Sequence, residues 1–109
     1  MRRFGQVIGI DPAAIDRYRS FHQKIWPEIE TAIREAGIRN YSIFLDGEQL
    51  LGYFEYHGPE DEFQQRMKLL AEAPRMREWW DIIEPMQKPR DGRPAGEWWL
   101  SLEEIFHQD

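Results

Sequence analysis

The feature that most constrains the fold is the spacing of apolar residues, which changes along the chain between the period of a strand and that of a helix. Proline and glycine lie at the boundaries between these segments. Together they predict the following elements: a strand at residues 3–10, a helix at 12–36, two strands within 38–57 around a turn at 46–49, helices at 58–74 and 75–84, a loop at 85–96 and a strand at 97–106.

This order predicts an α+β fold of the ferredoxin-like, split βαβ type, in which helices cover one face of a four-stranded antiparallel sheet. The chain has 109 residues, of which 41% are hydrophobic, so it can form one hydrophobic core without disulfides or a structural metal. No internal repeat or long linker divides the sequence. We therefore expect a single domain at residues 1–109.

The predicted strand at 50–57 carries large side chains on both faces. Leu51 and Tyr53 point to one face, whereas Leu50, Phe54 and Tyr56 point to the other. The helices can cover only one of these faces, so the other needs a cover from outside this short chain. The sequence therefore predicts a homodimer in which two sheets pack together, as in a dimeric α+β barrel.

Composition excludes several classes of function. The net charge of −6, from 14 basic and 20 acidic residues, argues against a nucleic-acid partner. The absence of cysteine excludes thiol catalysis and thiolate metal sites, and fits a reducing compartment, so we expect a cytoplasmic protein. No apolar run reaches membrane-spanning length, and His22, His57 and His107 lack metal-ligand spacing. We expect neither a membrane partner nor a metal.

A histidine lies in the apolar stripe of the first predicted helix. At about 100° per residue, one face collects Ile15, Tyr18, Phe21, His22, Ile25, Trp26, Ile29, Ala32, Ile33 and Ala36. Tyr18 and Trp26 lie one turn either side of His22. The simple interpretation is a core histidine that bonds one backbone carbonyl or the Tyr18 hydroxyl. The alternative is a small pocket lined by the polar tips of Tyr18, His22 and Trp26, in which a shielded imidazole serves as a general acid or base.

Pro27 bears on the choice between these interpretations. It removes a helical hydrogen bond from the Gln23 carbonyl and forces Trp26 away from helical geometry. We therefore expect a kink or break just after His22, which can open space beside the imidazole.

Three further aromatic residues are candidates for the same pocket. Tyr41 shares a strand face with Ile43 and Leu45, so its hydroxyl approaches His22 if that face meets the helices. Trp79 and Trp80 point about 100° apart on their helix, so one can reach the core and the other a pocket wall.

Three segments resemble a known family in their order and spacing. They are "YRSFHQKIWPEIE", "AGIRNYSIFLD" and "REWWDIIEPM", and their most specific parts are H-x-x-x-W-P-E, the N-Y pair and the W-W pair. The ordered set is similar to that of L-rhamnose mutarotases and of relatives that act on L-fucose, over nearly the whole chain.

This resemblance implies a dimeric ferredoxin-like fold without a cofactor and interconversion of the α and β anomers of a 6-deoxy sugar, L-rhamnose first and L-fucose as the alternative. It also implies that His22 is the proton donor and that Tyr18, Tyr41, Trp79 and Trp80 contact the sugar. Two other functions stay open: a haem-binding or monooxygenase-type enzyme on a dimeric α+β barrel, and a non-catalytic ligand-binding module.

Overall fold

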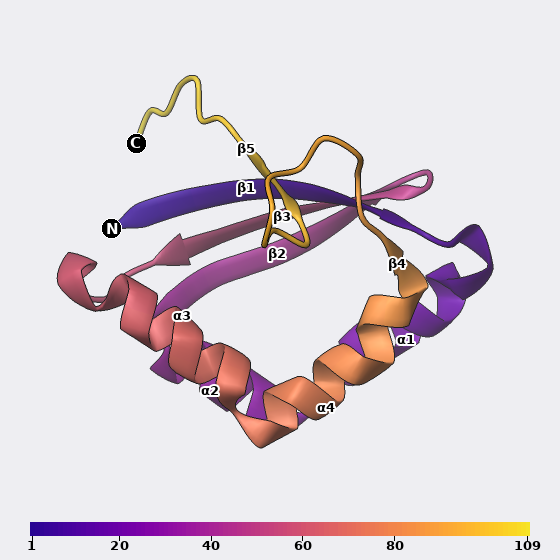
Figure 1. Ribbon diagram of the computed structural model, residues 1–109, viewed down its shortest axis with the longest axis horizontal. Helices are drawn as coiled ribbons and strands as arrows, with labels where there is room; N and C mark the ends of the chain where they lie inside the picture. The colour runs from indigo at the N-terminus through magenta and orange to yellow at the C-terminus, as the bar shows by residue number, and fades with distance from the viewer.

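The computed structural model describes the whole chain, Met1–Asp109. Its strands are β1 (Arg2–Ile10), β2 (Ile38–Asp46), β3 (Gln49–Tyr56), β4 (Gln87–Lys88) and β5 (Leu100–Leu102). Its α-helices are α1 (Ile15–Gln23), α2 (Pro27–Glu35), α3 (Phe63–Glu72) and α4 (Pro74–Ile83), with single 3-10 turns at Pro12–Ala14, Glu60–Glu62 and Glu84–Met86. Figure 1 shows all four α-helices on one face of a curved sheet. None of the helices is long and apolar enough to cross a bilayer.

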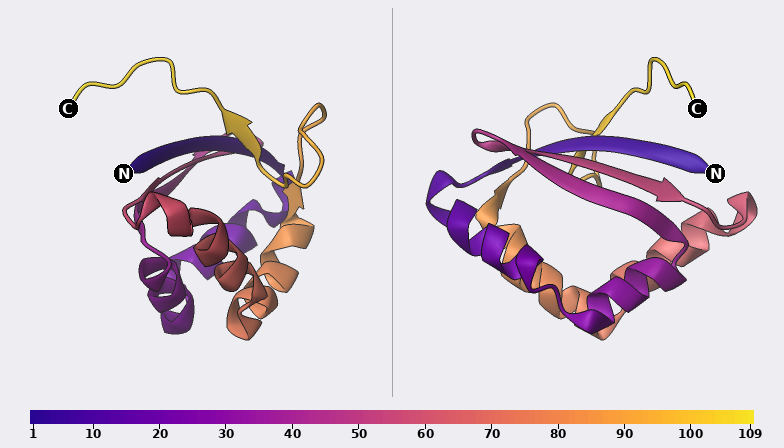
Figure 2. Two further views of the ribbon diagram at one scale, coloured as in Figure 1. Left: turned by 60° about the vertical axis from the view of Figure 1, so that its left-hand side comes forward. Right: turned by 180° about the vertical axis from the view of Figure 1, so that it is seen from behind.

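The sheet is antiparallel, in the order β2-β3-β1, and both β4 and β5 pair with the remaining edge of β1. The predicted ferredoxin-like α+β fold is confirmed, but the sheet has five strands rather than four. The last strand is also shorter than the predicted 97–106. β4 pairs with Gly9 and Ile10 of the β1 edge, so β5 begins only at Leu100, opposite Val7, and it ends at Leu102, opposite Gly5. Residues 103–109 then leave the sheet (Figure 2).

The predicted helix at 12–36 is interrupted where Pro27 predicts a break. Trp26 has extended backbone angles of φ −65° and ψ 133°, and Pro27 is the first residue of α2. His22 therefore lies in the last turn of α1. Gly37 ends the second helix with φ 92°, the left-handed conformation that favours glycine.

The core lies between the helices and the inner face of the sheet. It is formed by Ile8, Ile10, Tyr18, Ile29, Leu50, Met76, Trp79, Ile83 and Met86. Alternation along β3 places Leu50 and Tyr56 on this inner face and Leu51 on the outer face. On the outer face Phe44 is 63% and Leu51 38% exposed, whereas Val7, which pairs with Leu51, is only 5% exposed.

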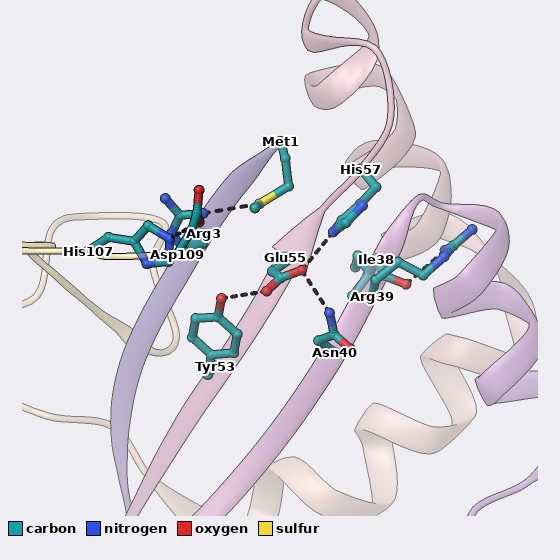
Figure 3. Close-up of polar contacts among 10 residues, drawn as sticks. All are labelled: Met1, Arg3, Ile38, Arg39, Asn40, Tyr53, Glu55, His57, His107 and Asp109. Atoms are coloured by element: carbon teal, nitrogen blue, oxygen red, sulfur yellow. Dashed lines mark hydrogen bonds and ion pairs between the residues drawn. The ribbon is translucent and has the colours of Figure 1, made fainter.

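A polar cluster occupies one end of the outer face. The Glu55 carboxylate accepts hydrogen bonds from the Tyr53 hydroxyl (2.7 Å), the Asn40 amide (2.8 Å) and His57 Nε2 (2.7 Å), as Figure 3 shows. These three donors, the Tyr53 hydroxyl foremost, lower the pKa of Glu55 to about 2. This end of the sheet therefore carries a fixed negative charge at neutral pH.

Candidate active site

A cavity of about 1080 Å³ opens between the inner face of the sheet and the helices. The predicted site residues Tyr18, His22, Tyr41, Trp79 and Trp80 all line it, from α1, β2 and α4. The fold therefore brings together residues that are up to 62 positions apart in the sequence, from 18 to 80.

His22 has a defined tautomer. Its Nδ1 lies 2.8 Å from the Tyr18 carbonyl oxygen, and because a carbonyl only accepts, Nδ1 carries the proton and donates. The imidazole ring stacks on the Tyr18 ring at 4.2 Å between centroids and meets the edge of Trp79 at 5.3 Å. Burial lowers the pKa of His22, and the carbonyl bond opposes this only in part. At neutral pH His22 is therefore neutral, with Nε2 free to accept a hydrogen bond.

The Tyr18 hydroxyl can donate a hydrogen bond to a molecule in the cavity, whereas His22 Nε2 can accept one. The same hydroxyl accepts a bond of 3.0 Å from the side-chain amide of Gln87, and the carbonyl oxygen of that amide accepts a bond of 2.7 Å from the Trp98 indole. The Tyr18 proton takes no part in these contacts and is available to a molecule in the cavity. Burial raises the pKa of Tyr18 well above its ordinary value, so the hydroxyl keeps its proton at neutral pH.

Tyr41 reaches the cavity from an irregular part of β2. The pairing of β2 with β3 shifts register between Arg39 and Ser42, and Asn40 adopts a positive φ of 54°. The Tyr41 side chain is 39% exposed, but burial around its hydroxyl raises the pKa to about 12. Tyr41 also raises the pKa of Tyr18 through its charge, and both residues line the cavity.

The tryptophans divide into cavity and core positions. Trp79 is only 3% exposed and packs edge-on against Phe21, His22 and Trp26, whereas Trp80 is half-buried on the cavity wall. Trp26 does not line the cavity. Its ring lies behind Trp79, with the Arg75 guanidinium 4.0 Å from its centre. The structure therefore gives no support to the predicted contact of Trp26 with a ligand, because the Pro27 break turns this residue out of the stripe.

Sequence reasoning missed two residues of the site. Gln87 is the only buried residue that is neither hydrophobic nor glycine, at 6% exposed, yet it lies in the segment predicted to be a surface loop. Trp98 lies in the segment predicted as a strand, 97–106, but it precedes β5 and lines the cavity. Neither residue had a periodic signal, because β4 is only two residues long and residues 89–99 contain no regular element.

At His22 the site places a hydrogen-bond acceptor, His22 Nε2, beside a donor, the Tyr18 hydroxyl, among aromatic rings. Both groups are neutral at neutral pH and can exchange protons with a ligand. Fold and site together define a small α+β protein of the ferredoxin-like type, with a pocket whose groups can donate and accept protons.

Comparisons with known proteins agree with this class and narrow it. The family model for L-rhamnose mutarotase matches residues 3–108. Proteins named L-rhamnose mutarotase from Oceanobacillus iheyensis and Lactiplantibacillus plantarum are each 36% identical to this chain over the full length of both proteins. One from Burkholderia orbicola is 38% identical over 90% of this chain and 89% of its own length.

Solved structures extend the comparison to the fold. An L-rhamnose mutarotase from Formosa agariphila superposes over all of both chains with a TM-score of 0.77 and 21% identity. A type-II polyketide cyclase, tetracenomycin F2 cyclase from Streptomyces glaucescens, has a TM-score of 0.69 and 17% identity over all of this chain and 98% of its own. The chain belongs to the L-rhamnose mutarotase family. This confirms the family predicted from the motifs and, with it, an isomerase that acts on a carbohydrate.

Proposed function

We propose that this chain interconverts the α and β anomers of L-rhamnose in the cavity around His22. The observation that carries the proposal is the adjacent pair of neutral groups with opposite roles, the acceptor His22 Nε2 and the donor Tyr18 hydroxyl. A cyclic sugar presents the complementary pair at its anomeric centre. Its ring oxygen can only accept a hydrogen bond, and its anomeric hydroxyl can donate one.

Ring opening follows from this pairing. His22 Nε2 removes the proton of the anomeric hydroxyl while the Tyr18 hydroxyl delivers its proton to the ring oxygen. The bond between the anomeric carbon and the ring oxygen breaks, and the electron pair of the anomeric O–H bond forms the aldehyde C=O. Rotation about the adjacent C–C bond exposes the other aldehyde face, and the reverse transfers close the ring. In this scheme His22 is the proton donor during ring closure and the base during ring opening.

The remaining site residues have binding roles in this proposal. The rings of Trp79 and Trp80 offer an apolar wall for the C–H face and the methyl group of a 6-deoxy sugar. Tyr41 also lines the cavity, its hydroxyl is protonated at neutral pH, and it can orient a sugar hydroxyl. All these steps use groups of this chain and of the sugar itself.

The direct test is proton NMR saturation transfer between the α and β anomeric signals of L-rhamnose, with and without the protein, with L-fucose measured in parallel. We expect faster exchange for L-rhamnose than for L-fucose. Faster exchange for L-fucose would contradict the proposed substrate, and no enhancement for either sugar with folded protein would contradict the proposed activity.

We also propose that two copies associate through the outer face of the sheet. The strand register aligns an apolar row across this face, formed by Phe44, Leu51, Val7 and Leu100, of which Phe44 and Leu51 are exposed and Val7 is buried. Beyond β5 the chain projects from the sheet (Figures 1 and 2), with Ile105 90% and Phe106 78% exposed. Both features leave large apolar groups in water that a second copy can cover. The expected cytoplasmic location stays a prediction.

Sedimentation velocity at micromolar concentration tests this association. We expect a dimer for the unmodified chain and a shift toward monomer for Phe44→Ser. Leu69→Ser is the matched control, because Leu69 is a similarly exposed leucine on α3, away from the sheet. A monomeric unmodified chain would contradict the proposal.

A further inference from the structure

We propose that Gln87 is a positioning residue that directs the Tyr18 proton into the cavity, an inference that rests on the function proposed above. Gln87 lies in β4, on the edge of β1, and connects Trp98 to Tyr18 through its amide. At 6% exposed, it is the only buried residue of the protein that is neither hydrophobic nor glycine. A buried amide is costly unless both of its ends are paired, and here both ends are.

The direction of the Gln87 amide follows from chemistry. An indole N–H can only donate, so the group of Gln87 that lies 2.7 Å from Trp98 Nε1 must be the carbonyl oxygen. The NH₂ group then has to face Tyr18, at 3.0 Å from its hydroxyl oxygen. The reversed amide would bring two donors together at Trp98. Trp98 therefore fixes which end of Gln87 meets Tyr18.

This fixed amide determines what Tyr18 can do. A tyrosine hydroxyl has one proton, and an amide carbonyl facing it would accept a hydrogen bond from that hydroxyl and so hold the proton away from the cavity. Because Gln87 presents N–H instead, the Tyr18 oxygen accepts and its proton stays available to an acceptor in the cavity. The same N–H stabilises the phenolate oxygen that forms when Tyr18 gives its proton to the sugar ring. Gln87 thus contributes more in the transition state than in the ground state, so kcat should depend on it more than KM.

The substitution Gln87→Glu tests this direction, because it keeps the shape of the side chain and reverses its hydrogen bonding. A carboxylate only accepts, so it takes both the Trp98 N–H and the Tyr18 O–H, and it turns the Tyr18 proton away from the cavity. A protonated carboxyl donates to Tyr18 as the amide does. We expect kcat at about pH 8 to fall at least tenfold. The largest expected loss is about 10² to 10⁴, the effect of removing a general acid altogether. We also expect partial recovery, relative to the unmodified protein, toward about pH 5.

Two further variants separate positioning from packing. Gln87→Met removes both hydrogen bonds at similar volume, and it should lower kcat by less than Gln87→Glu at about pH 8. In a Tyr18→Phe background neither substitution should lower kcat further, because Gln87 acts through the Tyr18 hydroxyl. The control Gln64→Glu makes the same change on an exposed position of α3 and should leave the rate unchanged.

Either of two results would overturn the inference: an unchanged kcat in both Gln87→Glu and Gln87→Met, or losses that add fully to that of Tyr18→Phe. If Gln87→Glu does not fold, the cycle of Gln87→Met with Tyr18→Phe decides alone. A readout independent of activity is the ¹³Cζ resonance of Tyr18, which should titrate with the new carboxyl in Gln87→Glu and stay constant between about pH 5 and pH 8 in the unmodified protein. A Tyr18 resonance that does not move with pH in Gln87→Glu would refute the inference about Gln87. Inactivity of the unmodified chain on both sugars is a separate result, and it would refute the proposed function.

Discussion

Substitution of Tyr18 by Phe separates the catalytic role of one oxygen atom from its structural role. Tyr18 is 5% exposed, and Tyr18→Phe removes the hydroxyl while keeping the ring that stacks on His22 at 4.2 Å. The structure gives this hydroxyl one partner within the chain, the Gln87 amide N–H at 3.0 Å. Because Gln87 is itself buried, the substitution leaves a buried donor without its acceptor, which costs about 1–3 kcal/mol of stability.

Both consequences of Tyr18→Phe can be measured on the same samples. A loss of this size lowers the melting temperature of a domain near 100 residues by about 4–8 °C per kcal/mol, so thermal unfolding followed by circular dichroism detects it. Saturation transfer on L-rhamnose should show an exchange rate that falls by about 10² to 10⁴. An unchanged exchange rate in folded Tyr18→Phe would refute the role of Tyr18 as the group that protonates the ring oxygen. An unchanged melting temperature would refute the buried hydrogen bond to Gln87.

Three further predictions follow from the geometry. Because burial lowers the pKa of His22, neutral His22 persists below pH 6.5, so kcat for anomer exchange should stay level from about pH 8 to below 6.5 and fall only as the imidazole protonates; a decline centred above 6.5 would contradict this. The hydrogen bonds that lower the pKa of Glu55 from 4.5 to about 2 should contribute stability that is present above pH 4.5 and lost as pH falls toward 2, and urea unfolding should show a smaller loss over that window in Glu55→Gln. Gly37→Ala should lower the free energy of unfolding by about 1–3 kcal/mol, because Gly37 has φ 92° and a Cβ there would lie 3.1 Å from the Tyr56 ring. Urea unfolding should show a smaller loss for Gly47→Ala, because Gly47 has φ 59° but a Cβ there would have no neighbour within 4 Å.

The sequence predicted those parts of the fold that local patterns determine. The helical stripe of residues 15–36 placed Tyr18 and His22 on the face that meets the sheet, and Pro27 located the break after His22. Tyr41 was placed on the correct strand face. These predictions succeeded because each depends on a residue's own backbone period or on the steric restriction of one proline.

The rest depends on competition between distant segments. β4 and β5 share one edge of β1, so where the last strand begins is set by residues far away in the sequence. The same shared edge brings Gln87 inward to Tyr18, 69 positions earlier, in a contact that no period encodes. Trp26 was assigned to the cavity by helical projection, but the projection no longer applies once Pro27 makes residue 26 extended.

The most direct test of the proposed mechanism is the exchange rate between α- and β-L-rhamnose in His22→Ala, measured by saturation transfer beside His107→Ala. His107 is a suitable control because it lies in the C-terminal segment, where it pairs only with Asp109. With both variants folded, we expect His22→Ala to lose about 10² to 10⁴ of the rate and His107→Ala to keep it. Full activity in His22→Ala would contradict the mechanism, because no other histidine lines the cavity.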